Sequence, residues 1–521
     1  MMAEWWPASA RGAILSKRPS FPMSPTKASD SVRSSPNVGA GTYLHQAGQI
    51  KALLLGSAGS IIGVGMTAFP RIAPSIFLDS YHVVALSKTA DLPLLRRRAD
   101  VFCLEEAGGG LPAHSRNSGA LLAHARTRDY LKSLPDPRHL LLYQSYPKLE
   151  DLAEKEGWIL LANPSALRLR LRERAFFQEM AENLHLSRVP GAIWPVAVLH
   201  EKSYRSWTRE LGPEIVIQLP DIARGGGRGT FFIRSAQDYD SLRERLKGNV
   251  WREARLKTIL VRRLIKGASA SAAVCVTQNG ILISGLQRQL IDVPYCATPI
   301  EKGIFCGHVW DGNAWTPTVR EAAMTQARKI GDFVASLGYR GILGIDFVIN
   351  ERTKTVYPLE INPRFTGAFP MLSFLHNQNG IIPLDIFHLI TFLNLPCQFD
   401  VAKLNRQYQL PLKGSHLLIF FPPHGRSVRG FDLRPGVYEA KLEDQTIRFV
   451  RDGIEYADIQ NENQFVVVDG PPAPEAIKKR PPDPLYRLCH VLFPSPVARA
   501  CGALSPHARG VLDWICGSTR R

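Results

Sequence analysis

The sequence predicts an α/β protein of several domains, and three patterns support this class. Strand-like apolar runs alternate with helical segments between residues 46 and 160, as in a parallel sheet with crossover helices. Two apolar runs flank a polar turn at residues 350–354, and short β-branched runs separated by Gly, Pro and Asp turns follow Phe399. At 521 residues the chain exceeds the size of one ordinary domain.

The first 45 residues are rich in Ser, Pro, Ala and Arg and contain only two acids, Glu4 and Asp30. They lack the continuous apolar core of a signal peptide, so we expect a disordered tail, with a transit peptide as the alternative. Over the whole chain, 64 Lys and Arg against 46 Asp and Glu give a net charge of +18. This charge favours anionic partners without choosing among them.

The eight cysteines form no C-x-x-C pair and no Cys/His spacing typical of zinc. We therefore expect reduced, buried thiols in a cytoplasmic protein. The sequence also contains no Cys–His or G-x-S-x-G signature, so it does not predict a side-chain nucleophile.

Residues 46–160 are predicted to form a Rossmann-like domain. Ala52–Pro70 has nineteen residues without a charge, but four glycines, two serines and a threonine make it a poor membrane span. It is predicted instead as a strand (Lys51–Leu55), a Gly-rich turn (56–63) and a helix. The turn is not G-x-G-x-x-G, so no dinucleotide site is inferred. Later strands of this sheet are expected at His82–Leu86, Val101–Leu104 and Leu140–Gln144.

The hairpin around the turn at 350–354 carries three hard oxygen donors. Its strands, Ile342–Ile349 and Thr355–Ile361, place Asp346 inside the first strand and Glu360 near the end of the second. Glu360 and Asn362 are two residues apart and share a face, which Asp346 joins if the register allows. Two carboxylates and an amide suit Mg²⁺ bound together with a nucleotide.

Arg364 lies two residues beyond Asn362 and returns a fixed cation to the same face, suited to a phosphate or a carboxylate. An ordinary hairpin whose acids pair with nearby Arg or Lys is the alternative.

The run D-F-V, a short turn and L-E-I-N-P-R-F-T-G resemble the metal-binding end of the ATP-grasp superfamily. The resemblance implies that Asp346, Glu360 and Asn362 bind Mg²⁺ or Mn²⁺ across the phosphates of ATP. It also implies that Arg364 is catalytic and steadies an acyl-phosphate or the substrate carboxylate.

The resemblance and the composition together divide the chain into five segments. These are a disordered tail (1–45), a Rossmann-like domain (46–160), a two-lobed ATP-grasp domain (161–400, hinge near 260–267), a β-rich domain (401–475), and a linker with terminal helices (476–521). The terminal helices are expected within Leu485–Cys516.

Other segments also resemble nucleotide-binding positions of the family, but some of them carry a different residue type. A helix over Ser165–Leu186 carries Arg174 where the family has a Lys near ATP, and Gln218 stands where a strand usually offers a Lys to the phosphates. Between strands Glu214–Leu219 and Thr230–Ile233, a glycine-dense loop resembles the family's flexible lid. The lid resemblance assigns to the nucleotide Arg224, Gly225, Gly226, Gly227 and Arg228.

Thr258–Ala268 resembles the hinge of the family, with Arg262 and Arg263 in place of acids. We expect Arg263 and the Leu264 backbone near the adenine. Further on, G-L-Q-R-Q-L and Y-C-A-T-P resemble a branch of predicted ATP-dependent carboligases related to biotin carboxylase. In that branch an R-Q pair points into the site, which nominates Arg288 as catalytic, followed by Gln289.

The resemblance implies a ligase that activates a carboxylate as an acyl-phosphate for attack by an amine, giving an amide, ADP and phosphate. Small-molecule acids and amines are the expected partners, nucleic acid is not, and a homodimer is one option. Two alternatives stay open. One is a carboxylase-like enzyme that phosphorylates bicarbonate, which would need a separate carrier because no M-K-M biotinyl signature is present. The other is a degenerate, non-catalytic binding protein, favoured by Gln218, Arg262 and Arg263.

Overall fold

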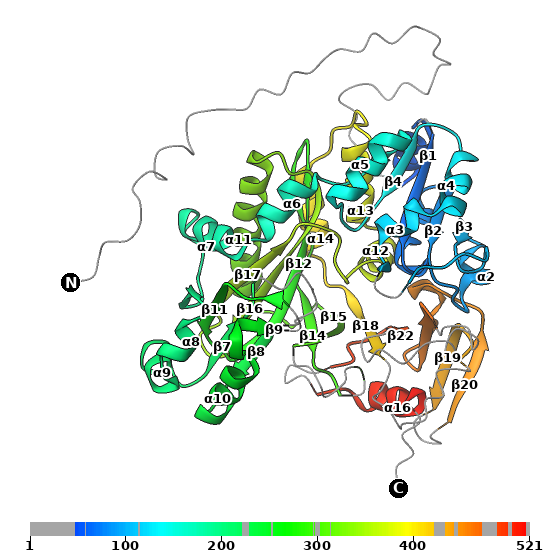
Figure 1. Cartoon of the computed structure of the whole chain (residues 1–521). Coiled ribbons are helices and arrows are strands. Elements are labelled where there is room, and N and C mark those ends of the chain that lie inside the picture. The colour runs from blue at the N-terminus through cyan, green and yellow to red at the C-terminus, as the bar shows by residue number, and fades with distance from the viewer. Residues whose placement is uncertain are drawn as a thin grey trace. The chain divides into compact units, whose positions relative to one another are not determined.

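A parallel sheet, a small antiparallel sheet and a large antiparallel sheet organise the chain (Figure 1). The computed structural model describes residues 47–57, 59–112, 115–220, 229–251, 254–294, 296, 303–312, 314–420, 433–441, 446–470, 487–498 and 503–516. All of them fall in one compact unit. The predicted tail over residues 1–45 lies outside the described residues.

The first sheet is parallel throughout, with the strand order β3-β2-β1-β4-β5 expected of a Rossmann-like fold. Its strands are β1 (Ser60–Gly65), β2 (Tyr81–Ala85), β3 (Asp100–Cys103), β4 (Arg138–Leu141) and β5 (Ile159–Leu160). Its helices are α1 (Ala47–Leu55), α2 (Leu92–Leu95), α3 (Ser118–Ala123), α4 (Ala125–Lys132) and α5 (Pro147–Glu156), with short 3₁₀ turns η2 (Phe69–Arg71) and η3 (Ala73–Ile76).

The start of this sheet differs from the prediction. The expected strand Lys51–Leu55 is part of helix α1, whose buried Ile50, Leu53 and Leu54 follow helical spacing. The first strand, β1, begins within the predicted Gly-rich turn and extends past it to Gly65. Its glycines allow close packing rather than a turn, because a Cβ added at Gly63 would lie 2.2 Å from the Tyr81 hydroxyl oxygen.

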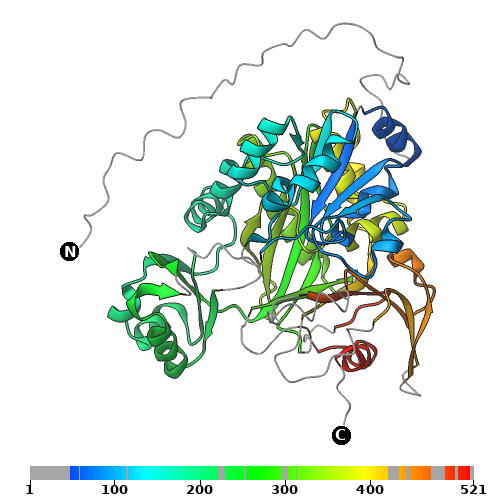
Figure 2. The same ribbon diagram turned by 45° about the vertical axis from the view of Figure 1, so that its right-hand side comes forward.

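A small lobe follows, with the antiparallel strand order β6-β11-β7-β8. Its elements are β6 (Gly191–Pro195), α8 (Val198–Glu201), α9 (Tyr204–Leu211), β7 (Ile215–Gln218), β8 (Thr230–Ile233), α10 (Ala236–Arg245), η5 (Lys247–Asn249), β9 (Val250–Trp251), β10 (Ala254–Arg255) and β11 (Thr258–Arg263). Figure 2 shows this lobe in green beside the large sheet. The predicted helix before it is two helices, α6 (Ser165–Arg172) and α7 (Arg174–Asn183), because Glu173 adopts an extended conformation.

The large sheet runs in the order β17-β16-β12-β14-β15-β18-β22-β21-β19-β20, with β13 beside β12. Its strands are β12 (Gly267–Thr277), β13 (Gly280–Ile283), β14 (Gln287–Ile291), β15 (Phe305–Asp311), β16 (Gly341–Asn350), β17 (Val356–Asn362), β18 (Lys413–Phe420), β19 (Gly436–Lys441), β20 (Thr446–Arg451), β21 (Gln464–Val468) and β22 (Arg487–Phe493). Its helices are α11 (Pro317–Ser336), α12 (Met371–Gln378), α13 (Leu384–Phe392), α14 (Val401–Tyr408) and α16 (Pro506–Ile515), with the turn η7 (Tyr456–Asp458).

The C-terminal strands therefore continue the sheet that contains the hairpin. Of the helices expected within Leu485–Cys516, only α16 is a helix in the described part of this range, and β22 is a strand. Every residue of β22 after Arg487 is buried between β18 and β21. A strand that is buried on both faces has no polar alternation to distinguish it from a helix.

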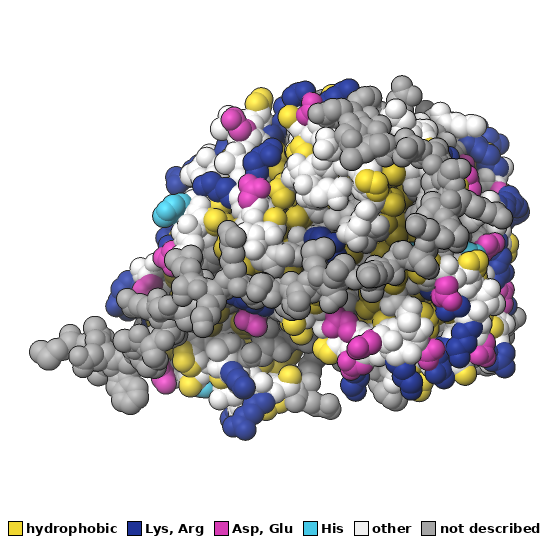
Figure 3. Space-filling model, turned by 90° about the horizontal axis from the view of Figure 1, so that it is seen from above, with side chains coloured by type: hydrophobic (Ala, Val, Ile, Leu, Met, Phe, Trp, Pro, Cys, Tyr) yellow, Lys and Arg dark blue, Asp and Glu magenta, His cyan; other side chains and the backbone are white. Residues whose placement is uncertain are grey.

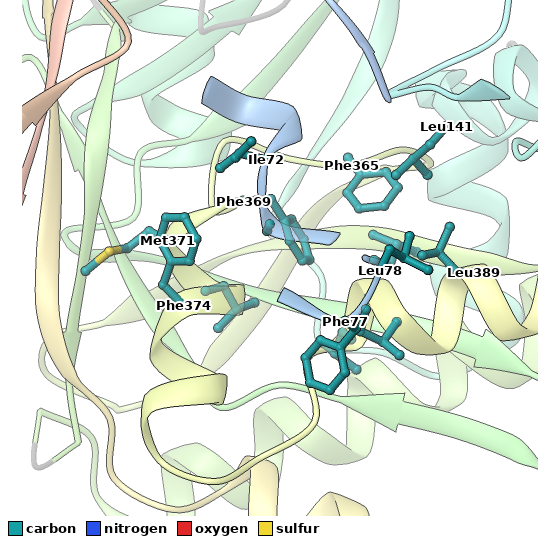
Figure 4. Packing of buried hydrophobic residues seen from close by; sticks show 14 of the residues in the cluster. Ile72, Phe77, Leu78, Leu141, Phe365, Phe369, Met371, Phe374 and Leu389 are labelled. Atoms are coloured by element: carbon teal, nitrogen blue, oxygen red, sulfur yellow. The ribbon is translucent and has the colours of Figure 1, made fainter. Parts of the chain in front are cut away.

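The two faces of the large sheet have different neighbours near the hairpin. Helix α11 packs on the face that presents Leu343, Ile345 and Phe347. On the other face, α12 and α13 join the N-terminal domain in one core. Figure 4 shows Phe77 and Leu78 of the N-terminal domain among Phe365, Phe369 and Phe374.

This core holds the chain just after the hairpin. Phe365 stacks on Tyr143 of the N-terminal domain with ring centroids 5.6 Å apart. The Tyr143 hydroxyl donates a hydrogen bond to the Phe369 carbonyl oxygen over 3.2 Å. Because Arg364 directly precedes Phe365, the N-terminal domain helps to fix the backbone that carries this cation.

In the described part of the chain, no helix is both long and apolar enough to span a bilayer. On the face seen in Figure 3, Lys and Arg side chains are scattered among Asp and Glu and do not gather into one patch.

His376 on α12 is fully buried, and neither ring nitrogen has a hydrogen-bond partner among the described residues. Burial lowers its pKa to about 3. As the pH falls below the ordinary value of about 6.5, the unfolded chain takes up a proton that the folded chain refuses, so stability falls. We expect His376→Met to remove this loss. The free energy of unfolding of the variant, relative to that of the wild type, should therefore increase by about 2 kcal/mol between about pH 7 and pH 5.

Urea unfolding at several pH values measures this difference. His200→Met on α8 is the matched control, because the His200 ring is exposed. A difference in the free energy of unfolding between His376→Met and the wild type that stays constant with pH would contradict the prediction.

Candidate active site

An open cavity of about 840 Å³ lies between the small lobe and the hairpin end of the large sheet. Strands β7, β8 and β11 line one side, and β12, β14, β16 and β17 line the other. Among the described lining residues, seven are Lys or Arg and four are Asp or Glu. This excess of positive charge favours an anionic ligand.

The predicted hairpin is formed by β16 and β17, and it brings the three predicted metal ligands together. Asp346 lies directly opposite Glu360, and Gly344 lies opposite Asn362. The Asn362 side-chain amide donates to one Asp346 carboxylate oxygen over 2.9 Å. All three side chains line the cavity. The register that the sequence left open therefore places both carboxylates on one face.

The two carboxyl groups have opposite pKa shifts. Burial, and then the nearby Glu360, raise the pKa of Asp346 to about 8. Burial acts most strongly to raise the pKa of Glu360, but the Arg174 guanidinium, the hydrogen bond with Asp346 and the Arg364 guanidinium together outweigh it, and the pKa of Glu360 is lowered. The two facing carboxylates thus hold a proton between them at neutral pH. The carboxylate and amide oxygens of these three residues are ligand types that fit Mg²⁺.

Two of the predicted cations border these oxygens. Arg174 forms an ion pair with Glu360 and also donates to the Leu359 carbonyl oxygen over 3.4 Å. Arg364 donates to the Asn362 side-chain oxygen over 3.2 Å and to the Phe365 carbonyl oxygen over 2.8 Å.

A third cation, Arg262, lies beside Gln218, the position at which the sequence lacks the expected Lys. Arg262 on β11 donates a hydrogen bond to the Gln218 side-chain oxygen on the neighbouring strand β7. Gln218 in turn donates to the Thr230 hydroxyl over 3.2 Å. Burial and the nearby Arg174 lower the pKa of Arg262 to about 10, so its guanidinium is charged at neutral pH. The cavity therefore holds a cation beside residue 218, supplied by the adjacent strand.

The hinge differs from the expectation at Arg263 and Leu264. The Arg263 guanidinium points to the helix side of β11 and donates to the Leu211 carbonyl oxygen over 2.8 Å. The Leu264 N–H donates to the Glu214 carbonyl oxygen over 2.9 Å, so a backbone contact from Leu264 to adenine would use its carbonyl group. Both residues nonetheless contribute to the lining.

Glu214 supplies a carboxylate to the hinge that the sequence analysis missed. It lines the cavity and pairs with Lys266 at 2.9 Å and with Arg234 at 3.6 Å. Glu214 comes from the chain directly before β7, outside the hinge motif, so the motif gives no sign of it.

Arg288 is not brought to the cavity. It lies opposite Ala270 on the face covered by α11, and its guanidinium carbon is 4.9 Å from the Trp315 ring centroid. Side chains alternate along a strand, so the next residue, Gln289, faces the cavity instead. The Gln289 amide donates to Asp346 over 2.8 Å.

The predicted lid residues Arg224, Gly225, Gly226, Gly227 and Arg228 lie outside the described residues. Another residue of the cavity wall, His308 on β15, was missed, because no motif surrounds it in the sequence. Its Nε2 lies 3.5 Å from the hydroxyl oxygen of Ser271, which also lines the cavity.

Residues 210–368 match the model of the ATP-grasp domain family. Over 208 residues the chain is 25% identical to the arginine-specific carbamoyl phosphate synthase large chain of Geobacillus stearothermophilus. That match covers 39% of this chain and spans only 17% of the length of that relative.

Solved structures share the fold at low sequence identity. One is the biotin carboxylase domain of Hydrogenobacter thermophilus 2-oxoglutarate carboxylase, in complex with MgADP, ADP and bicarbonate. It has a TM-score of 0.54 and 13% identity, covering 84% of this chain and 87% of that one. Another is the carboxyaminoimidazole ribonucleotide synthase of Aspergillus clavatus in complex with ATP. It has a TM-score of 0.51 and 13% identity, and the match covers 88% of this chain and 99% of that one. The predicted resemblance to the ATP-grasp superfamily is confirmed: residues 210–368 of this chain carry an ATP-grasp domain.

Proposed function

We propose that this protein is a ligase that uses ATP to activate a carboxylate as an acyl-phosphate and then joins it to an amine. The observation that carries the proposal is the facing pair of Asp346 and Glu360 beside Asn362, in a cavity with excess positive charge. A pair of carboxylates inside a basic cavity fits a polyphosphate bound together with a divalent cation.

Three arginines are placed to bind the phosphates. Arg174, Arg262 and Arg364 all line the cavity, and they come from α7, β11 and the segment after β17. Guanidinium groups suit phosphate oxygens because they offer several N–H donors in a fixed plane. At the hinge end, Glu214 provides a carboxylate for a hydroxyl or amino group of the nucleoside.

Asp346, Glu360 and Asn362 would hold Mg²⁺ or Mn²⁺, which when bound neutralises charge on the transferring phosphoryl group. Glu360 is paired with Arg174, so the ion pair holds both side chains at the cavity wall. With a metal ion held by Glu360, Arg174 would be placed to contact a phosphate oxygen beside it.

The chemistry needs no side-chain nucleophile. The substrate carboxylate attacks the γ-phosphoryl group and ADP leaves; the amine then attacks the acyl carbon and phosphate leaves. Arg364 is held by Asn362 and the Phe365 carbonyl and would stabilise the oxyanion of the second step. Gln289, rather than Arg288, takes the position beside Asp346.

ADP release by the purified protein with MgATP tests this function, across pools of amino acids, organic acids and bicarbonate. We expect release that requires both a carboxylate and an amine, and none with Asn362→Ala. Release that requires bicarbonate alone would replace the proposal with a carboxylase-like reaction. If every pool is silent and ATP does not bind, the protein is a binding protein with an enzyme's fold.

A further inference from the structure

Beyond the cavity, a file of three histidines continues across the large sheet. His308 on β15, His416 on β18 and His490 on β22 lie on neighbouring strands, and we call them the histidine file. His308 Nδ1 is 2.8 Å from His416 Nε2, and His416 Nδ1 is 2.5 Å from His490 Nε2. At most 2% of each residue's surface is exposed. The file therefore forms one hydrogen-bonded chain inside the protein.

The first end of the file opens on the cavity. His308 is part of the cavity wall, and its Nε2 faces the Ser271 hydroxyl. Ser271 lies opposite Asp346 in the register of β12 and β16. His308 itself lies on β15, which β12 and β14 separate from the hairpin, so the file meets the cavity beside Ser271.

The other end of the file reaches a pair of buried acids. His490 Nδ1 is 3.9 Å from an Asp469 carboxylate oxygen, which also pairs with Arg487. The Asp469 N–H donates to the Asp91 carboxylate over 2.8 Å. His490 Nδ1 has no hydrogen-bond partner among the described residues. A shift of about 1 Å would bring it within hydrogen-bonding distance of Asp469.

A relay along the file requires one particular tautomer of each ring. To pass a proton to Asp469, His490 must carry it as Nδ1–H, because a carboxylate only accepts. The Nε2 of His490 then accepts from Nδ1–H of His416, and the Nε2 of His416 accepts from Nδ1–H of His308. One lone pair is left over at the cavity end, on His308 Nε2.

The environment favours passing a proton over keeping it. Burial lowers the pKa of His308 to about 3, so this ring does not retain a proton. At the far end, burial raises the pKa of Asp91 to about 7. At this end Asp469 is paired with Arg487, whose side chain is 38% exposed, and its N–H contacts Asp91.

We propose that the histidine file is a proton relay that takes the proton of the attacking amine out of the cavity. This rests on the proposed ligase function. As the C–N bond forms and the C–O bond to phosphate breaks, the amine proton moves to His308 Nε2. The Nδ1 proton of His308 moves to His416 Nε2, and that of His416 moves to His490 Nε2. The Nδ1 proton of His490 then moves to the Asp469 carboxylate. Each ring ends neutral, and phosphate leaves with the electron pair.

The tautomers can be measured without any substrate. Imidazole nitrogen NMR of the whole protein, labelled with ¹⁵N-histidine, distinguishes protonated from unprotonated nitrogens. We expect Nδ1–H and bare Nε2 in all three rings of the file, with His308→Gln and His416→Met used to assign the signals. A hydrogen on His308 Nε2 would overturn the relay, because no lone pair would face the cavity.

The functional test separates acyl activation from amine attack. A pool of organic acids with MgATP is given either hydroxylamine or a pool of amino acids. Hydroxylamine is uncharged near neutral pH and traps an acyl-phosphate without needing a buried base. We expect His308→Gln to form hydroxamate within about twofold of the wild type and to lose about 100-fold in amide formation. His416→Met should behave alike, although it does not line the cavity.

His376→Met, another buried histidine change, is the control and should keep both activities. Equal loss of hydroxamate and amide in both file variants would overturn the relay and indicate a structural role for the histidines. Unchanged amide formation would also overturn it. If the wild type itself forms no hydroxamate from any acid, the ligase proposal fails, and the relay fails with it.

Discussion

Glu360→Gln is expected to lower ADP release at least about 1,000-fold while the protein remains folded. The substitution removes one of the two facing carboxylates on which the proposed cation site depends and leaves Arg174 without its ion-pair partner. The measurement is ADP release in the substrate pool that supports the wild type, with urea unfolding to verify stability. Calorimetry of ADP binding with and without Mg²⁺ adds a second readout. Mg²⁺ should tighten ADP binding to the wild type and have little effect on the variant.

Glu439→Gln provides a matched control for this substitution. Glu439 is also a strand glutamate paired with an arginine, Arg448, at 2.7 Å, but it lies on β19 away from the cavity. It should retain wild-type ADP release and Mg²⁺-dependent ADP binding. Normal turnover by Glu360→Gln would rule out the metal site at this hairpin.

The hairpin was predictable because its signals are local. Glu360 and Asn362 share a face through their spacing, and the polar turn sets the two strands antiparallel. The register that places Asp346 opposite Glu360 was not fixed by the sequence, because β16 and β17 contain an irregularity after Asp346. Family resemblance, rather than spacing, brought Arg174 and Gln218 into consideration.

The errors come from information that short motifs lack. Arg288 and Gln289 are adjacent, and a strand places one on each face, so only the pairing of β14 with β12 decides which one enters the cavity. The histidine file joins residues more than 70 positions apart, such as His416 and His490, through the order of strands in a sheet. Strand order across such distances is not encoded in any local pattern.

The exchange at Gln218 and Arg262 is also invisible along the chain. Read one position at a time, a missing Lys and a missing acid both suggest weakened ATP binding. In the structure the two residues lie on neighbouring strands and contact each other, so a positive charge lies beside Gln218 in the cavity.

This arrangement predicts that Arg262→Glu weakens MgADP binding by about 30- to 150-fold, or about 2–3 kcal/mol. The substitution replaces a half-buried cation of the cavity with a carboxylate, close to Glu360 and to the position where we propose that the phosphates bind. Calorimetry with MgADP measures the effect. Arg205→Glu is the control, because it makes the same charge change at an exposed position on helix α9 of the same lobe.

The double variant Arg262→Glu with Gln218→Lys makes the test specific to the contact. The introduced lysine would restore a cation on β7 and pair with the new carboxylate on β11, so we expect affinity to return to within about threefold of the wild type. If Gln218→Lys gives no rescue, the loss in Arg262→Glu reflects general electrostatics of the cavity. If Arg262→Glu binds MgADP normally, the phosphates must be held elsewhere, and the exchange of charge between the two strands has no role in nucleotide binding.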